Sequence, residues 1–191
     1  DLIFLNYIKK ISKQINLLSK NFNKNMLIKN FLRTELDMGP NFYLFNKKFL
    51  IDQKIFFKKG FFEDILFMLK VFTKIKKFQR FKRKFYKKNL VSNSITNSFS
   101  FKHVNDFNKT CLDKINYFNK HISKKIRKVS YDDLQYGLRG DYIFSRRLLN
   151  NYKPSKKNIA NIKGFFKKIL TKNFIALTRY DNIVLEELFK K

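Results

Sequence analysis

Positive charge dominates this chain along its whole length, and no other feature of the sequence limits so strongly what the chain can be. Lys and Arg number 43 against 14 Asp and Glu, so the formal net charge is +29 over 191 residues. Like charges repel one another across a compact fold unless a partner of opposite sign neutralises them. Because the excess is distributed and not confined to one tail, we expect a polyanionic partner that surrounds the protein, which favours nucleic acid.

The composition also indicates that the chain folds and suggests where it is encoded. Hydrophobic residues make up 44% and aromatic residues 17%, which is too apolar for a disordered basic tail. Phe occurs 24 times, whereas Ala occurs only at Ala160 and Ala176 and Trp is absent. Phe, Lys, Asn and Ile have AT-rich codons, so an AT-rich organellar genome explains the bias and part of the Lys excess. We expect the mitochondrial matrix as the location, with a plastid as the alternative.

Cysteine and histidine are too few for a disulfide framework or a metal centre. Cys111 is the single cysteine, and His103 and His121 are the only histidines. A structural zinc site normally needs four ligands in short paired spacings. We therefore expect no metal and no cofactor.

Hydrophobic periodicity predicts a mostly α-helical fold of basic helices with irregular connections and little or no sheet. Apolar residues recur every three or four positions over residues 2–22, 62–78 and 112–122, which is typical of amphipathic helices. Ser130 followed by Asp133 predicts a helix start, and further helices are expected at 156–170 and from about 171–174 to the C-terminus. Residues 41–57 alternate loosely between apolar and polar, a pattern that fits short strands or irregular chain alike.

A polar stretch divides the chain into two basic regions. Residues 89–101 are rich in Ser and Asn, which compete with helix for backbone hydrogen bonds. We expect a helical N-terminal region at 1–88, a linker at 89–101 and a second helical region at 102–191.

Several motifs of the C-terminal third occur together in one known family. They are Tyr136-Gly137-Leu138-Arg139, the pair Arg146-Arg147, an aromatic and basic group at 165–168, and Arg179-Tyr180-Asp181-Asn182 followed by two branched aliphatic residues. In this order and at similar separations they resemble the bacterial-type small-subunit ribosomal protein four family. The resemblance implies a protein that binds the 5′ domain of small-subunit rRNA early in assembly, here in an organellar version.

Two departures from the family pattern qualify what the resemblance implies. Family members continue into a compact RNA-binding module after the Arg179 motif, whereas only residues 185–191 follow it here. Either that module is lost, or a separate chain supplies it and is one expected partner, besides neighbouring ribosomal proteins. The first 130 residues show no family motif and no cysteine cluster.

Basic runs provide the candidate RNA-binding residues. Lys and Arg neutralise phosphates, Arg binds phosphate oxygens bidentately, and interspersed aromatics stack on unpaired bases. Residues 74–88 are expected to form a basic helix with an aromatic every three to five residues, and 124–128 form a second run. The candidates are Lys74, Lys76, Lys77, Arg80, Lys82, Arg83, Lys84, Lys87, Lys88, Lys124, Lys125, Arg127, Lys128, Arg139, Arg146, Arg147 and Arg179. Asp181 is expected to be structural, pairing with Arg179 or capping the last helix.

Other functional classes are less consistent with this sequence. It contains no glycine-rich phosphate loop and no local Ser-His or Cys-His arrangement, so we expect no enzyme. No apolar run approaches the ~20 residues of a membrane-spanning helix. The alternatives to a mitochondrial small-subunit protein are a large-subunit ribosomal protein, an accessory subunit of a respiratory membrane complex, and a DNA-binding or maturase-like protein.

Overall fold

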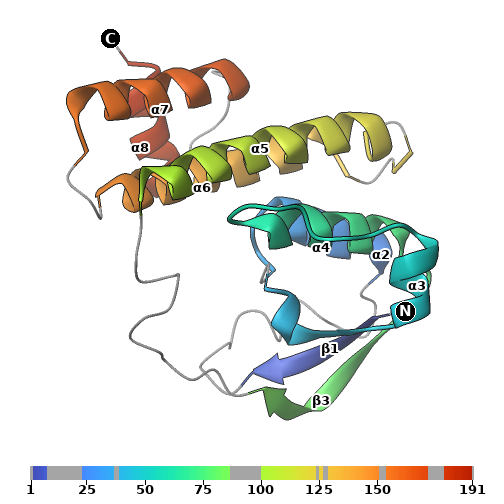
Figure 1. Cartoon of the computed structure of the whole chain (residues 1–191). Coiled ribbons are helices and arrows are strands. Elements are labelled where there is room, and N and C mark those ends of the chain that lie inside the picture. The colour runs from blue at the N-terminus through green and yellow to red at the C-terminus, as the bar shows by residue number, and fades with distance from the viewer. Residues whose placement is uncertain are drawn as a thin grey trace.

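The computed structural model describes residues 2–7, 23–36, 39–86, 100–123, 125–126, 129–150, 154–171 and 179–190. Its helices are α2 (Lys24–Leu32), α3 (Lys47–Asp52), α4 (Glu63–Lys74), α5 (Phe101–His121), α6 (Tyr131–Asn150), α7 (Lys156–Ile169) and α8 (Arg179–Leu188), with a 3₁₀ turn at Pro40–Phe42. Its strands are β1 (Leu2–Tyr7), β2 (Tyr43–Phe45) and β3 (Phe78–Tyr86). The expectation of a mostly α-helical fold with little sheet is confirmed (Figure 1).

Helix starts follow the capping residues in the sequence. At α6 the Ser130 hydroxyl accepts from the Asp133 amide at 3.3 Å, and the Asp133 carboxylate accepts from the Ser130 amide at 3.0 Å. Ser155 accepts from the amide of Asn158 at the start of α7. Each such cap contributes about 1 kcal/mol by satisfying amides that have no partner within the helix. The predicted starts of α6 and α7 are confirmed.

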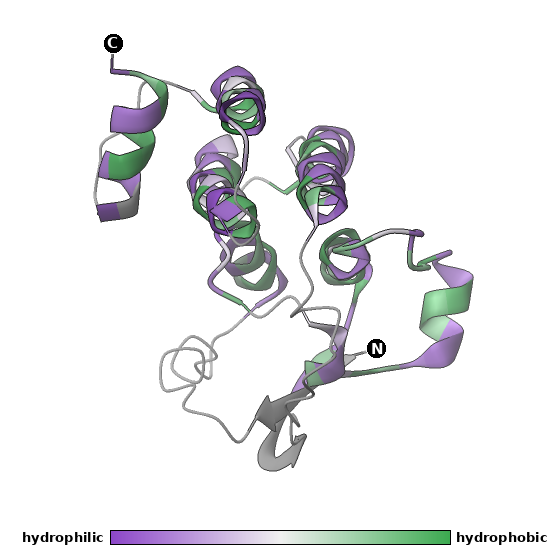
Figure 2. Ribbon diagram, turned by 60° about the vertical axis from the view of Figure 1, so that its left-hand side comes forward, coloured by the Kyte–Doolittle hydropathy of each residue, from purple (hydrophilic) through white to green (hydrophobic). Residues whose placement is uncertain are grey.

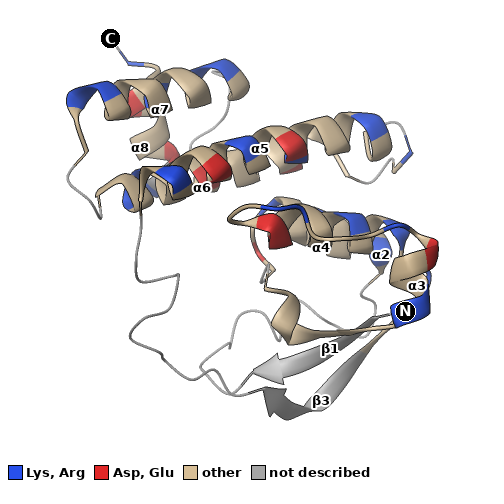
Figure 3. Ribbon diagram, viewed as in Figure 1, with Lys and Arg blue, Asp and Glu red and all other residues tan. Residues whose placement is uncertain are grey.

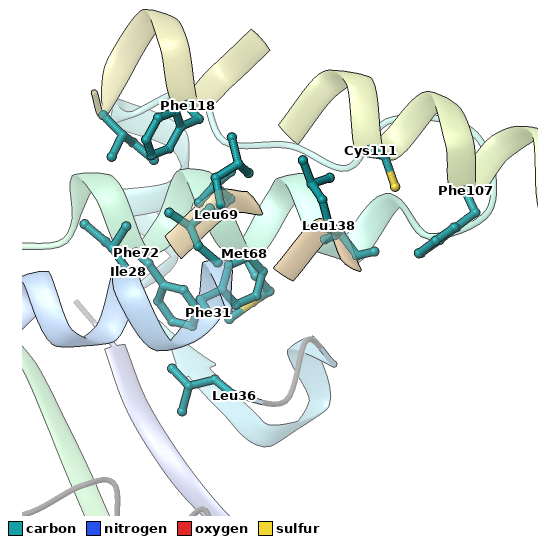
Figure 4. Close-up of a cluster of buried hydrophobic side chains, with 14 of the residues drawn as sticks. Ile28, Phe31, Leu36, Met68, Leu69, Phe72, Phe107, Cys111, Phe118 and Leu138 are labelled. Carbon is teal, nitrogen blue, oxygen red and sulfur yellow. The ribbon is translucent and has the colours of Figure 1, made fainter. Parts of the chain in front are cut away.

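The helices pack around one hydrophobic cluster that draws on both halves of the chain. α2 and α4 lie against α5 and α6, and α7 and α8 pack on α6. Phe31, Phe72 and Phe118 are fully buried together with Leu138, and the rings of Phe31 and Phe72 meet edge to face at 5.0 Å (Figure 4). Apolar faces turn toward one another and hydrophilic faces turn outward (Figure 2). Burial of these side chains contributes about 1.5–3 kcal/mol each.

Gly137 allows α2 and α6 to approach each other unusually closely. A Cβ placed on Gly137 would lie 1.7 Å from the carbonyl oxygen of Leu32, at the end of α2. Only glycine permits this contact. The next residues, Arg33 and Thr34, are thereby set over one face of α6, and Thr34 adopts a left-handed φ of 59° that a β-branched residue rarely adopts.

The helix predicted at 2–22 is wrong where the structure describes it, because Leu2–Tyr7 is a strand; residues 8–22 lie outside the described residues. β1 is the central strand of a three-stranded sheet, antiparallel to β2 and parallel to β3. The run Leu2-Ile3-Phe4-Leu5 satisfies the helical and the strand pattern alike. Hydrogen bonding from neighbours on both sides decides between them.

The basic helix predicted at 74–88 is also wrong. α4 ends at Lys74, Ile75 turns to ψ 142°, and Phe78–Tyr86 forms β3 beside β1. A helix here would place like charges four residues apart at Arg80 and Lys84, with no carboxylate to relieve them. Aromatic residues favour strands, so pairing with β1 prevails.

The linker predicted at 89–101 lies mostly outside the described residues, and its last two members belong to the start of α5. Phe101 is the first residue of α5, and the amide of Ser100 donates to Nδ1 of His103 at 3.0 Å. The helix expected at 112–122 is therefore the second half of a 21-residue helix.

Candidate nucleic-acid interface

The ends of α4 and α5 bring together cations from separate parts of the sequence. We call Lys70, Lys74, Lys120, His121 and Lys125 the α4–α5 cluster. The pKa of His121 is lowered, first by partial burial and secondly by the charges of the four lysines of this cluster. The pKa of Lys70 is likewise lowered by burial and by the charges of Lys58 and Lys74. The members thus lie close enough to repel one another, and an anion would relieve that repulsion.

Packing of α4 on α5 creates this cluster. Both helices end on the same side of the molecule (Figure 1). The hydroxyls of Thr73 and Tyr117 lie 2.7 Å apart, and the Tyr117 ring lies 4.5 Å from the ring of His121. Lys74 lies in the last turn of α4, and Lys120 and His121 lie in the last turn of α5, where the helix dipole favours cations. The ammonium of Lys74 also donates to the carbonyl of Gln53 at 2.7 Å.

A second cationic surface covers the outer side of α7. This helix contains five lysines and no acidic residue. Ile162 and Phe166 are buried against the core, whereas Ala160 and Gly164 are exposed between the lysines. The outer face, which we call the α7 face, comprises Lys156, Lys157, Lys163, Lys167 and Lys168. No neighbouring carboxylate on the helix offsets these charges, so the α7 face can accept phosphate groups.

The two surfaces lie at different ends of the helical layer. α7 lies away from the side on which α4 and α5 end, and Lys and Arg are seen on α7 and at the far end of α5 (Figure 3). One small anion cannot contact both surfaces. A polyanion that passes around the protein can.

Three carboxylates of the described residues lie in the interior and pair with cations there. Asp133, Asp141 and Asp181 are all buried. Asp141 pairs with Lys114, which is itself buried, and Asp181 pairs with Arg139 at 2.6 Å. Asp133 pairs with Lys29 and Arg33. Buried carboxylates neutralise buried or half-buried cations, so they do little to offset the exposed lysines.

Two predicted RNA-binding arginines instead connect α6 to α8. Arg139 is 7% exposed and forms the buried pair with Asp181. The Nε of Arg146 lies 3.1 Å from Glu187, which also accepts from the hydroxyl of Tyr142. The pKa of Tyr142 is raised, mainly by burial and secondly by the hydrogen bond of its hydroxyl to Glu187. Asp181 was expected to pair with Arg179 or to cap the last helix, and the structure pairs its carboxylate with Arg139 of the neighbouring helix, a partner that the sequence did not indicate.

The remaining predicted residues are spread over several settings. Lys76, Lys77, Lys125, Arg147 and Arg179 are exposed. Lys74 and Lys125, predicted in two separate runs, meet in the α4–α5 cluster. Four candidates lie in β3, where the structure describes the backbone and the register: Arg80, Lys82, Arg83 and Lys84. Five lie outside the described residues: Lys87, Lys88, Lys124, Arg127 and Lys128.

Sequence reasoning missed the α7 face, Lys70 and Lys120. The signal for α7 was present, because lysines at 156, 157, 163, 167 and 168 fall on one side of a helix whose apolar residues fall on the other. Lys70 and Lys120 carried no such signal, since their proximity depends on how α4 packs on α5.

No metal or membrane site emerges from the part of the chain that the structure describes. Within those residues no three His, Cys, Asp or Glu side chains are grouped so that they could hold a metal ion. None of the described helices combines the length and the apolar character needed to cross a membrane. Comparison with protein-family models, curated proteins and solved structures found no match.

Proposed function

We propose that this protein is a structural constituent of a mitochondrial small ribosomal subunit that binds and stabilises small-subunit rRNA. The observation that carries the proposal is the pair of cationic surfaces, the α4–α5 cluster and the α7 face, which lie at different ends of the helical layer (Figure 3). A folded RNA offers phosphates on several sides at once, whereas a single acidic protein patch offers negative charge on one.

The motifs behind the ribosomal resemblance support the proposal through their packing. Arg139 of the Tyr-Gly-Leu-Arg segment forms the buried pair with Asp181 of the Arg-x-Asp-Asn segment. Gly137 of the first segment is the residue on which the end of α2 rests. Two of the motifs that carry the resemblance are therefore in direct contact in the fold. The mitochondrial assignment rests on the AT-rich composition.

Salt dependence of binding tests whether the cluster contacts phosphate. Removal of one phosphate contact reduces the slope of log K against log salt concentration by about 0.7–0.9. The variant Lys120→Gln/Lys125→Gln should reduce the slope for a transcript of the 5′ domain by about 1.5. Its matched control is Lys109→Gln/Lys190→Gln, since these exposed lysines each have a carboxylate partner, Asp106 and Glu186. The control should leave the slope unchanged.

Sedimentation tests the assignment to the ribosome. The protein should migrate with the small subunit in a sucrose gradient of mitochondrial lysate and be released by high salt. Migration with the large subunit would redirect the proposal to that particle. Recovery in a membrane-complex fraction that resists ribonuclease would overturn it.

A further inference from the structure

A pocket between the end of α2 and the face of α6 combines features that neither of the cationic surfaces has. Its volume is about 290 Å³, near the lower limit for small-molecule sites, so it suits a group of modest size. The end of α2 forms one wall and α6 the other, and the contact of Leu32 with Gly137 fixes their separation.

The lining of the pocket is both aromatic and polar. The guanidinium of Arg33 lies 4.0 Å from the centre of the Tyr136 ring, and that of Arg139 lies 5.3 Å from it. The carboxylates of Glu35 and Asp181 also line the pocket, where they pair with Arg33 at 2.9 Å and with Arg139 at 2.6 Å. Ile143 and Phe144 supply apolar surface.

This mixture discriminates between classes of ligand. A bare anion would meet the carboxylates of Glu35 and Asp181 as well as the arginines. A purely apolar ligand would cover the polar groups of the lining without forming hydrogen bonds to them. A nucleobase has a flat apolar face together with donors and acceptors on its edge, and it therefore matches the whole lining.

Phe144 and Arg147 lie on the same wall of the pocket, one turn apart on α6. Phe144 is 38% exposed, although its ring meets Phe107 at 4.9 Å and Phe62 at 5.8 Å. One part of the ring is thus held by the core while another part stays accessible. Arg147 is exposed, so a base that lies against Phe144 would bring its phosphate within reach of this guanidinium.

The backbone of the α2 wall is strained. Thr34 has φ 59°, its hydroxyl donates to the carbonyl of Arg33 at 2.6 Å, and it lines the pocket. Such a conformation costs on the order of 1–3 kcal/mol in a β-branched residue and persists where surrounding contacts impose it. Here it turns the chain sharply after α2, so that Arg33 and Glu35 both face α6.

We propose that this pocket binds one unpaired nucleotide of the RNA, with the base against Phe144 and the phosphate at Arg147. The inference rests on the proposed function, since it names the part of the RNA that this surface recognises. It assigns the pocket to base stacking and the two lysine surfaces to phosphate contacts.

Substitution of Phe144 tests the stacking. Phe144→Leu keeps apolar volume but removes the ring, and stacking on an aromatic ring contributes about 1–3 kcal/mol per base. With a transcript of the 5′ domain as probe, the full-length variant should bind about fivefold to a hundredfold more weakly, with an unchanged salt slope. Phe144→Tyr keeps the ring and should restore binding. Phe56→Leu, at an aromatic residue that is 59% exposed and lies outside the pocket, is the matched control.

Crosslinking gives a second readout that does not depend on variant stability. Ultraviolet irradiation of the wild-type complex, followed by mass spectrometry, should place a nucleotide adduct on the peptide that contains Phe144. The proposal is supported if Phe144→Leu binds more weakly while Phe144→Tyr and Phe56→Leu bind normally, and if this adduct is found. If the wild-type chain binds the transcript and neither effect occurs, the pocket proposal fails while the proposed function stands. If the chain binds the transcript no better than an unrelated RNA, the proposed function fails and the pocket proposal with it.

Discussion

Replacement of Gly137 by alanine tests the contact on which the arrangement of α2 and α6 depends. The added Cβ would lie 1.7 Å from the carbonyl oxygen of Leu32, which is backbone and cannot rotate away. Alanine in a helix interior is favoured over glycine by about 0.5–1 kcal/mol, but overpacking typically costs about 1–3 kcal/mol or more. Since this clash is severe, we expect a net loss of about 2 kcal/mol.

Gly164 provides a matched control on α7. A Cβ there would meet no atom within 4 Å, and the residue is exposed. Gly164→Ala should therefore stabilise the protein by about 0.5–1 kcal/mol, the helix-propensity gain alone. The two substitutions are chemically identical and are expected to have opposite signs.

Equilibrium unfolding in urea, followed by circular dichroism, measures both variants. For a chain of this size about 1 kcal/mol corresponds to about 2–4 °C in Tm, so thermal melts should separate them clearly. A Gly137→Ala variant as stable as Gly164→Ala would refute the close approach of α2 to α6. The walls of the proposed nucleotide pocket would then be misplaced as well.

Three further predictions concern buried and titrating groups. Lys114→Met leaves the buried carboxylate of Asp141 without its cation, so it should lower the free energy of unfolding in urea by about 3–5 kcal/mol. The double variant Lys114→Met/Asp141→Leu should recover most of this loss. A double variant that is as unstable as the single one would contradict the pairing. The pKa of the Cys111 thiol is raised, mainly by burial and secondly by the charge of Asp141. A disulfide reagent should therefore label the folded protein far more slowly than the urea-unfolded protein. Equal labelling rates would contradict the burial of this thiol. The pKa of His121 is lowered, first by burial and secondly by the charges of nearby lysines. A bound phosphate should raise this pKa again, so binding takes up a proton. The affinity for RNA should therefore increase as the pH falls through the ordinary histidine value of 6.5. The same pH dependence in His121→Gln would exclude this histidine as its source.

Local sequence signals predicted the helices that have their own caps and apolar stripes. Ser130 with Asp133 marked the start of α6, because a cap is a contact between residues three apart. β1 and β3 were missed because their hydrogen bonds join residues far apart in sequence, such as Leu2 and Phe78. No local pattern contains that pairing.

The candidate interface was only partly predictable for the same reason. The sequence shows how many lysines there are, and the helical period of α7 shows which of them share a face. It does not show that Lys74 and Lys125 approach His121, or that Arg139 is directed at Asp181. Charge counts cannot separate arginines that hold helices together from those that remain exposed, because both look the same in sequence.

Identification of the RNA bound in mitochondria tests the central claim most directly. The protein can be crosslinked in intact organelles and purified under denaturing conditions, and the attached RNA fragments can be sequenced. We predict reads concentrated in the 5′ domain of small-subunit rRNA. Reads confined to large-subunit rRNA or to other transcripts, or recovery of the protein without RNA, would contradict the account.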